Sequence, residues 1–327
     1  MNILIAADSF KGSCSARQVT DTIERAAKNV LPDVTVTKIP VADGGEGTVD
    51  ALIAAMHGTK VTVPVHDPLG RPITAEYGLL PDGSAVIETA AASGLTLLKP
   101  EERDALHAST FGAGELIRHA LKHGVKKFIL GLGGSATTDG GAGLARALGI
   151  SFLDPDGKEL EPGGVHLSEL ASISTDGLLK EAAGCEFVVA CDVKNHLCGA
   201  LGAAAVFGPQ KGADEKQIKI LDEALVHYAA ILKDKLHCDA ADTDGSGAAG
   251  GLLCGILPYF PVTICSGIDL VLDLTDFDEH VRHADLVVTG EGRIDFQSAL
   301  GKVPVGVASR AKKLRNVPVI AIAGAKG

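Results

Sequence analysis

Residues 126–143 read KKFILGLGGSATTDGGAG, and this stretch indicates the fold class. The apolar run Phe128–Leu130 is typical of a buried strand. The glycine-rich segment after it leads into a helix predicted over 142–148, which Gly149 ends. A strand that passes through a glycine-rich turn into a helix is the repeating unit of α/β proteins.

The same order of strand, turn and helix occurs elsewhere in the chain. NILIAADSF at 2–10 precedes a capping-box pattern at Ser15–Gln18 and a helix that extends to Val30. VTVTKIPVA at 34–42 precedes the loop DGGEG and a helix predicted over 48–57. Further apolar strands are predicted at 185–193, 284–295 and 317–324. The alternation predicts an α/β fold with a largely parallel sheet.

Composition and charge exclude nucleic-acid-binding classes. The 327 residues carry a formal net charge of −11, contain no Trp, and include only 4% aromatic residues. Proteins that bind nucleic acid usually carry a basic stripe, and those that bind single strands also need aromatic stacking surfaces. We therefore expect small-molecule partners and no nucleic acid.

Several features bear on the location of the protein. Ala248 to Ile268 carries no charge and is long enough to span a bilayer, but its glycines and prolines favour a buried helix, a turn and a strand. The N-terminus lacks the basic region of a signal peptide. The seven cysteines form no CxxC pair, which is typical of reduced thiols. We expect a cytoplasmic protein with no membrane span, as a monomer or a homodimer.

Polar side chains gather at the carboxyl ends of the predicted strands, where ligands bind in open α/β sheets. Asp8, Ser9 and Lys11 follow the first strand. The others, in chain order, are Asp43 and Glu46, Ser135 and Asp139, Asp192 and Asn195, and finally Glu291, Arg293, Asp295 and Lys302. This recurrence is a stronger signal of a site than any single residue.

The glycines around these residues indicate a backbone that approaches a ligand closely. Asp43 and Glu46 stand among Gly44, Gly45 and Gly47, although a turn whose acids point to water would have the same sequence. In GLGGSATTDGGAG, exposed N–H groups before a helix would attract phosphate, but such turns also occur for packing alone. Carboxylates suit Mg²⁺, and Lys or Arg would neutralise a phosphoryl group. The GxxxxGK[ST], GxSxG and HExxH motifs are absent.

Taken together, these blocks resemble the glycerate kinase family of the bacterial, glycerate 2-kinase-like type. The matching blocks run in family order from Asp8 to Ala308: DSFKGS, PVADGGEGT, ETAAASGL, GGSATTDGGAG, CDV-N-L-G, VFGPQKGA, GAAGG, ADLVVTGEGRID and GKVPVGVA. Family members usually have a further segment after the strand near 317–323.

The resemblance implies a fold and an activity. The fold would have two domains: a doubly wound, flavodoxin- or Rossmann-like parallel sheet from 1–61 plus 281–327, and an inserted α/β domain from 62–280. The active site would lie in the interdomain cleft. The activity would be the ATP- and Mg²⁺-dependent phosphorylation of D-glycerate to 2-phosphoglycerate.

On this resemblance we assign roles to individual residues as hypotheses. Lys11 and Arg293 would bind the glycerate carboxylate or the transferring phosphate, and Asp192 would be the base. The substrate-binding residues would be Asp8, Ser9, Asp43, Glu46, Asn195 and Glu291, with Asp43 and Glu291 also candidates for Mg²⁺ ligation. The ATP phosphates would lie on Gly133, Gly134, Ser135, Asp139 and Gly140, with Lys302 as a further contact.

Other functions stay open at this point. A related kinase could phosphorylate another small hydroxy acid, or could form 3-phosphoglycerate. A ligand sensor that kept the cleft would bind without turnover. A dehydrogenase is possible on the fold alone, but the chain has no strand-linked GxGxxG followed by an acid about 20 residues later.

Overall fold

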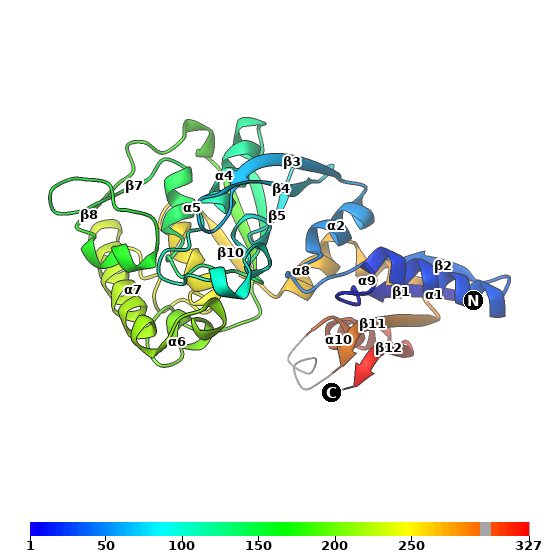
Figure 1. Cartoon of the computed structure of the whole chain (residues 1–327). Helices are drawn as coiled ribbons and strands as arrows, with labels where there is room; N and C mark the ends of the chain where they lie inside the picture. The colour runs from blue at the N-terminus through cyan, green and yellow to red at the C-terminus, as the bar shows by residue number, and fades with distance from the viewer. Residues whose placement is uncertain (295–301, 327) are drawn as a thin grey trace. The chain divides into compact units, whose positions relative to one another are not determined.

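A computed structural model of the chain, which describes residues 1–294 and 302–326, confirms the predicted α/β class (Figure 1). Asp295 and Gly301, singled out in the sequence, lie outside the described residues. The chain divides into two compact units, with residues 1–60, 78–82 and 265–327 in the first unit and 61–77 and 83–264 in the second. The domain limits drawn from the sequence stay a prediction.

The first unit contains a parallel sheet with the strand order β12–β11–β1–β2 in its described residues. In chain order this is the 2-1-3-4 arrangement of flavodoxin-like doubly wound sheets, whose switch point lies between the first and third strands. The elements are β1 (Asn2–Ala7), α1 (Ala16–Val30), β2 (Thr35–Lys38), α2 (Thr48–Met56), α8 (Gly267–Leu274), α9 (Phe277–His283), β11 (Leu286–Ile294), α10 (Val303–Arg315) and β12 (Val319–Lys326).

Local sequence explains how β1 and α1 form. Five of the six residues of β1 are buried, as its apolar sequence predicts. The predicted capping box is confirmed at Ser15: its Oγ accepts from the Gln18 N–H at 3.2 Å, and the Gln18 side chain accepts from the Ser15 N–H at 2.9 Å. Ile23 and Ala27 of α1 then pack on the sheet beside Ile5.

The second unit is built around a six-stranded sheet with the order β10–β9–β6–β5–β4–β3 among the described strands, in which β5, β6 and β9 run parallel. Its strands are β3 (Thr59–His66), β4 (Pro72–Leu79), β5 (Ala85–Glu88), β6 (Lys127–Gly131), β7 (Ser151–Leu153), β8 (Ser172–Ser174), β9 (Glu186–Ala190) and β10 (Val262–Cys265). Its α-helices are α3 (Ala90–Ser93), α4 (Phe111–Lys122), α5 (Ala142–Ala147), α6 (Ala203–Phe207) and α7 (Glu215–Leu236). Short 3₁₀ segments join them: η1 (Leu95–Leu97), η2 (Pro100–Glu102), η3 (Gly164–Glu169), η4 (Lys180–Ala182), η5 (Pro209–Lys211), η6 (Ala248–Gly250) and η7 (Leu252–Gly255).

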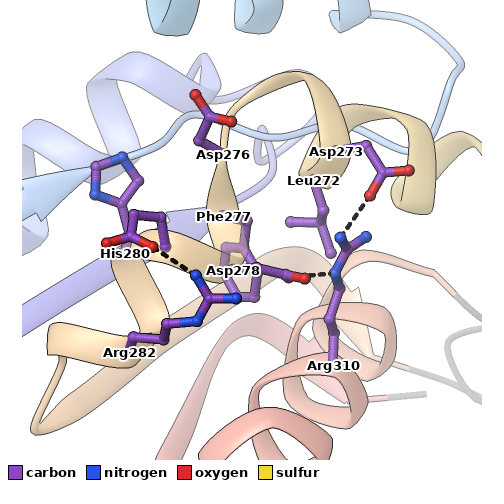
Figure 2. Close-up of a pocket in the computed structure, with 9 residues that line it drawn as sticks. Leu272, Asp273, Asp276, Phe277, Asp278, His280, Arg282 and Arg310 are labelled. Carbon is purple, nitrogen blue, oxygen red and sulfur yellow. Dashed lines mark hydrogen bonds and ion pairs between the residues drawn. The ribbon is translucent and has the colours of Figure 1, made fainter.

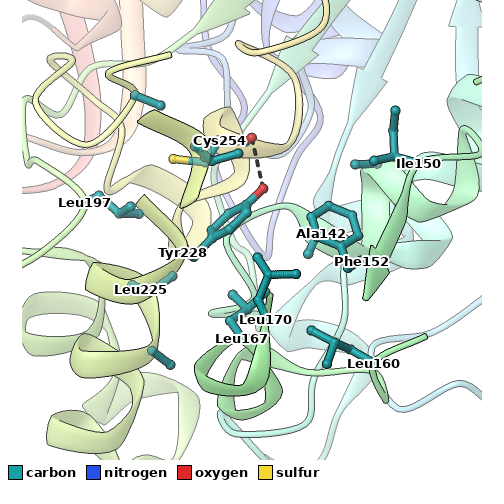
Figure 3. Packing of buried hydrophobic residues seen from close by; sticks show 14 of the residues in the cluster. Ala142, Ile150, Phe152, Leu160, Leu167, Leu170, Leu197, Leu225, Tyr228 and Cys254 are labelled. Atoms are coloured by element: carbon teal, nitrogen blue, oxygen red, sulfur yellow. Dashed lines mark hydrogen bonds between the residues drawn. The ribbon is translucent and has the colours of Figure 1, made fainter. Parts of the chain in front are cut away.

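An apolar core beside α5 and α7 supports the glycine-rich loop of the second unit (Figure 3). Tyr228 of α7 lies in this core, where its ring meets Phe152 edge-on and its hydroxyl donates to the Cys254 carbonyl at 3.2 Å. A Cβ atom at Gly140 would come within 2.7 Å of the Tyr228 ring. The loop can therefore lie on this core only because position 140 has no side chain.

The uncharged stretch at 248–268 is not the helix, turn and strand that the sequence predicts. It forms η6 and η7, a turn, and β10, and then enters α8. Gly250 and Gly251 have φ angles of 69° and 90°, which a regular helix does not allow, so the helix part of the prediction is wrong. Among the residues that the structure describes, no helix is both long and apolar enough to cross a membrane.

Candidate active site

Several of the predicted residues of the first unit come together where β1 ends beside β11. Ala7, the last residue of β1, pairs with Gly290, and the Asp8 N–H donates to the Gly290 carbonyl at 2.9 Å. Strand β11 continues for four residues beyond this point, so Glu291 and Arg293 extend past the end of β1. This is the switch point of the sheet, where open α/β folds bind their ligands.

Asp8 is the electrostatic centre of this group. Its side chain is 4% exposed. Burial, and then the negative charge of Asp43, raise the pKa of the Asp8 carboxyl from 3.8 to about 7. The hydrogen bond from the Ser9 N–H at 2.6 Å and the positive charge of Lys11 act against this rise. Asp8, Asp43 and Lys11 therefore lie close enough to interact, and the group has an excess of negative charge.

The loop at 40–48 brings Asp43 into this group by means of its glycines. Gly44 and Gly47 have φ angles of 84° and 93°, and Asp43 Oδ1 accepts from the Gly45 N–H at 3.2 Å. A Cβ atom at Gly267, the first residue of α8, would lie 2.0 Å from the Asp43 carbonyl oxygen. Bare backbone on both sides thus fixes the place of Asp43. Glu46 is exposed on the same loop.

Lys11 stands on a tight turn against β11. The Phe10 N–H donates to the Cys14 carbonyl at 2.8 Å, and the Cys14 N–H returns the bond at 3.0 Å. A Cβ atom at Gly292 would lie 3.4 Å from the Lys11 nitrogen, so the turn packs directly on the extension of β11. Lys11 and Arg293 are both exposed, whereas Glu291 is buried. Lys302 directly precedes α10.

In the second unit, the loop after β6 is held by backbone bonds. The Leu95 N–H donates to the Gly134 carbonyl at 2.9 Å, and the Ala136 N–H donates to the Ser93 carbonyl at 2.8 Å. Ser135 Oγ lies 2.9 Å from the Thr137 hydroxyl, within hydrogen-bond distance. Gly133 and Gly134 are exposed, and the chain is buried from Ser135 onward. The loop therefore presents its first two glycines to solvent on a fixed backbone.

Asp139 anchors the inner end of this loop. Its carboxylate is 1% exposed and accepts from the Thr110 N–H at 2.7 Å, the Thr110 hydroxyl at 2.8 Å, and the N–H groups of Gly141 and Gly143. Burial raises the pKa of the Asp139 carboxyl, and these hydrogen bonds oppose the rise. Asp139 thus caps the starts of α4 and α5. Sequence reasoning missed Thr110, for which the chain gives no local signal.

Asp192 and Asn195 lie just after β9. Asp192 is exposed. Asn195 Nδ2 donates to the Leu201 carbonyl at 2.8 Å, and the Asn195 carbonyl accepts from the Gly247 N–H at the same distance. A Cβ atom at Gly247 would be 2.3 Å from the His196 carbonyl. Close packing of two loops therefore holds the segment that carries Asp192.

Lys211 is a second residue that sequence reasoning missed. It ends η5, its side chain is 2% exposed, and its Nζ donates to the Thr137 carbonyl of the glycine-rich loop at 2.5 Å. Burial lowers the pKa of the Lys211 ammonium group from 10.5 to about 7, and the negative charge of Asp139 opposes this shift. The available signal was a lysine between glycines in GPQKG.

Another pocket of the first unit, of about 620 Å³, contains none of the predicted residues. It is lined by α8, α9 and Arg310 of α10, and Figure 2 shows the Arg310 guanidinium reaching the carboxylates of Asp273 and Asp278. Since both acids are neutralised by one arginine, we interpret the pocket as an ion-paired junction between these helices.

Comparison with known proteins gives a consistent result. The model of the glycerate kinase family matches residues 3–327. A glycerate kinase of Bacillus subtilis is 50% identical over 325 residues, which are 99% of this chain and 85% of the relative. A glycerate 2-kinase of Escherichia coli K12 is 48% identical over 99% of this chain and 85% of its own length. The crystal structure of a Salmonella typhimurium LT2 protein, described as a candidate glycerate kinase 2, superimposes with a TM-score of 0.94 at 49% identity, covering 99% of this chain and 87% of that one.

Proposed function

The chain belongs to the glycerate kinase family, and we propose from this premise that it phosphorylates D-glycerate with ATP, giving 2-phosphoglycerate and ADP. The observation that carries the proposal is the crowded group around Asp8, at a sheet edge where such folds bind ligands. Phosphoryl transfer depends mainly on positioning and on neutralisation of charge, and both kinds of residue are present. We expect glycerate and ATP as the small-molecule partners, and a cytoplasmic location.

The residues of the Asp8 group fit the binding of a small hydroxy acid. Lys11, exposed on its short turn, would pair with the glycerate carboxylate or the transferring phosphate, as would Arg293 on the extension of β11. The carboxylates of Asp8 and Asp43 would accept hydrogen bonds from the glycerate hydroxyls. Ser9, Glu46 and Asn195 are the further substrate contacts that we propose.

The same group fits Mg²⁺. Its donors are oxygens, which Mg²⁺ prefers, and the raised pKa of Asp8 shows that the site lacks positive charge. Among the described residues, no set of three or more His, Cys, Asp or Glu side chains is arranged to hold a metal ion. This agrees with the habit of Mg²⁺ of using one or two carboxylates together with substrate phosphates. Asp43 and Glu291 would hold the ion, which when bound neutralises phosphate charge.

We assign the binding of the ATP phosphates to the glycine-rich loop. The exposed N–H groups of Gly133 and Gly134 would donate to phosphate oxygens, together with Ser135 and Gly140. Asp139 would act by fixing the loop, because its oxygens are already used by four donors. Lys302 would contribute a second positive charge. Asp192 would take the proton of the attacking hydroxyl.

The test is turnover by the purified chain with Mg²⁺-ATP and D-glycerate, with the product identified by ³¹P and ¹H NMR. We expect 2-phosphoglycerate, as the name of the E. coli relative suggests. Formation of 3-phosphoglycerate would contradict the position of transfer, and turnover of another hydroxy acid alone would contradict the substrate. Binding without turnover would favour a ligand sensor.

The assignment of Asp192 is tested separately. Asp192→Asn keeps the size of the side chain but not its basicity, so kcat should fall by about 100-fold or more while the KM for ATP changes little. The matched control is Asp176→Asn, which changes an exposed aspartate elsewhere in the second unit. A normal kcat in Asp192→Asn would remove the residue from the mechanism.

A further inference from the structure

Lys211 is an unexpected feature of the second unit, because a lysine is almost never fully buried without a paired carboxylate. Its hydrogen-bond acceptor is a neutral carbonyl, that of Thr137. Burying an ammonium group in this way costs free energy that a Met or Leu at this position would avoid. The fold alone therefore gives no reason for a cation here.

The surroundings of Lys211 are built to keep it in place. Gly212 has a φ of 94° and lies against Arg103, since a Cβ atom there would be 2.9 Å from both the Arg103 carbonyl and its Cβ. The Arg103 guanidinium in turn donates to the Gln210 carbonyl at 3.1 Å. Asp139 is the acidic group whose charge acts on Lys211. The 209–212 turn therefore holds the amine against the inner side of the glycine-rich loop.

Two hydroxyl groups beside this loop add a second observation. Ser93 Oγ and Thr138 Oγ1 are buried and have no hydrogen-bond partner among the described residues. The Ser93 carbonyl binds the loop through the Ala136 N–H, and Thr138 follows the carbonyl that Lys211 holds. Unpaired buried polar groups are uncommon in native proteins and mark places where function outweighs packing.

We propose that Lys211 is a positioning residue for polyphosphate binding: it fixes the loop at the Thr137 carbonyl and supplies a positive charge behind the exposed Gly133–Gly134 backbone. This inference rests on the phosphate-binding role proposed above for that loop. A charge acts more strongly inside a protein than in water, since the surrounding dielectric is lower. Lys211 thus supports the anion without touching it.

The experiment compares Lys211→Met and Lys211→Gln with the wild-type chain. Met keeps the stem without the charge, whereas Gln keeps a donor for the Thr137 carbonyl without the charge. The probe is inorganic tripolyphosphate, measured by calorimetry at pH 6 and pH 9. The matched control is Lys126→Met, because Lys126 also donates to backbone carbonyls, those of Glu181 and Ala183, outside the loop.

We expect both Lys211 variants to bind tripolyphosphate about tenfold or more weakly than wild type at pH 6, with Lys126→Met unchanged. The ratio should shrink at pH 9, because the pKa of Lys211 is about 7 in the free protein and the wild-type charge is then partly lost. In turnover, the KM for ATP should rise while the KM for glycerate stays constant. A structural lysine would not give this split or this pH dependence.

Three outcomes would overturn the inference. The first is wild-type affinity in Lys211→Gln, which would show that the charge is not needed. The second is equal weakening at both pH values, and the third is no tripolyphosphate binding by the wild-type chain. Failure of the proposed function reads differently: it would appear as absent glycerate phosphorylation by wild type, whatever the tripolyphosphate result. If Lys211→Met does not give a cooperative melt, Lys211→Gln alone decides.

Discussion

Replacing Asp8 with Asn should make the ligand-free protein more stable at neutral pH. The raised pKa means that the folded chain holds the Asp8 proton more tightly than the unfolded chain does. The stabilising contribution is therefore fully present below pH 4 and is lost as the pH rises through about 7. A shift from 3.8 to about 7 corresponds to a cost of about 4 kcal/mol, at about 1.4 kcal/mol per unit, as an upper bound.

Asn removes this cost and keeps the oxygen that accepts from the Ser9 N–H. Thermal melts in EDTA, without substrates, should show Asp8→Asn above wild type by a few degrees at pH 8, since about 1 kcal/mol moves Tm by about 2–4 °C in a chain of this size. At pH 4.5 the two melts should coincide. Asp33→Asn, at an exposed position of the same unit, is the control. An equal gain at both pH values, or no gain at pH 8, would refute the reasoning.

Two further substitutions test the anchors of the site. Thr110→Val removes the hydroxyl that donates to Asp139 and accepts a backbone N–H from α5, so urea unfolding should show a loss of about 2–4 kcal/mol, most of which Thr110→Ser restores. Gly267→Ala places a methyl group 2.0 Å from the Asp43 carbonyl, so that loop must shift and kcat/KM for glycerate should fall by about tenfold or more. Gly70→Ala, where a Cβ atom meets open space at a φ of 77°, should cost about 1 kcal/mol of stability and leave kcat/KM unchanged.

The sequence could predict the fold class because its signals are local. Apolar runs followed by glycine turns identified β1 and β6, and the Ser15 capping box identified the start of α1. The helix predicted within 248–268 failed for an equally local reason, the positive φ angles of Gly250 and Gly251. Periodicity recorded that this stretch is buried, but not that its backbone cannot form a regular helix.

The candidate site was only partly predictable, because proximity depends on strand order. The polar residues after each strand could be named, but the interaction of Asp8 with Asp43 and the pairing of Ala7 with Gly290 follow from the order β2–β1–β11. Lys211 had no detectable signal: a lysine between glycines is typical of an exposed turn. Its burial comes from packing against segments that are distant in the sequence.

The two buried aspartates, Asp8 and Asp139, show how a carboxylate that serves the fold differs from one that serves a ligand. Asp139 has four donors, and each belongs to a helix start that would otherwise be left unpaired. The Asp8 carboxylate has one donor in the described chain, the Ser9 N–H, and the negative charge of Asp43 acts on it. A fold optimised for stability alone would pair Asp8 or replace it. Because the missing partner is a positive charge or a hydrogen-bond donor, the arrangement is complete only when a ligand supplies one, and stability is given up in advance for binding.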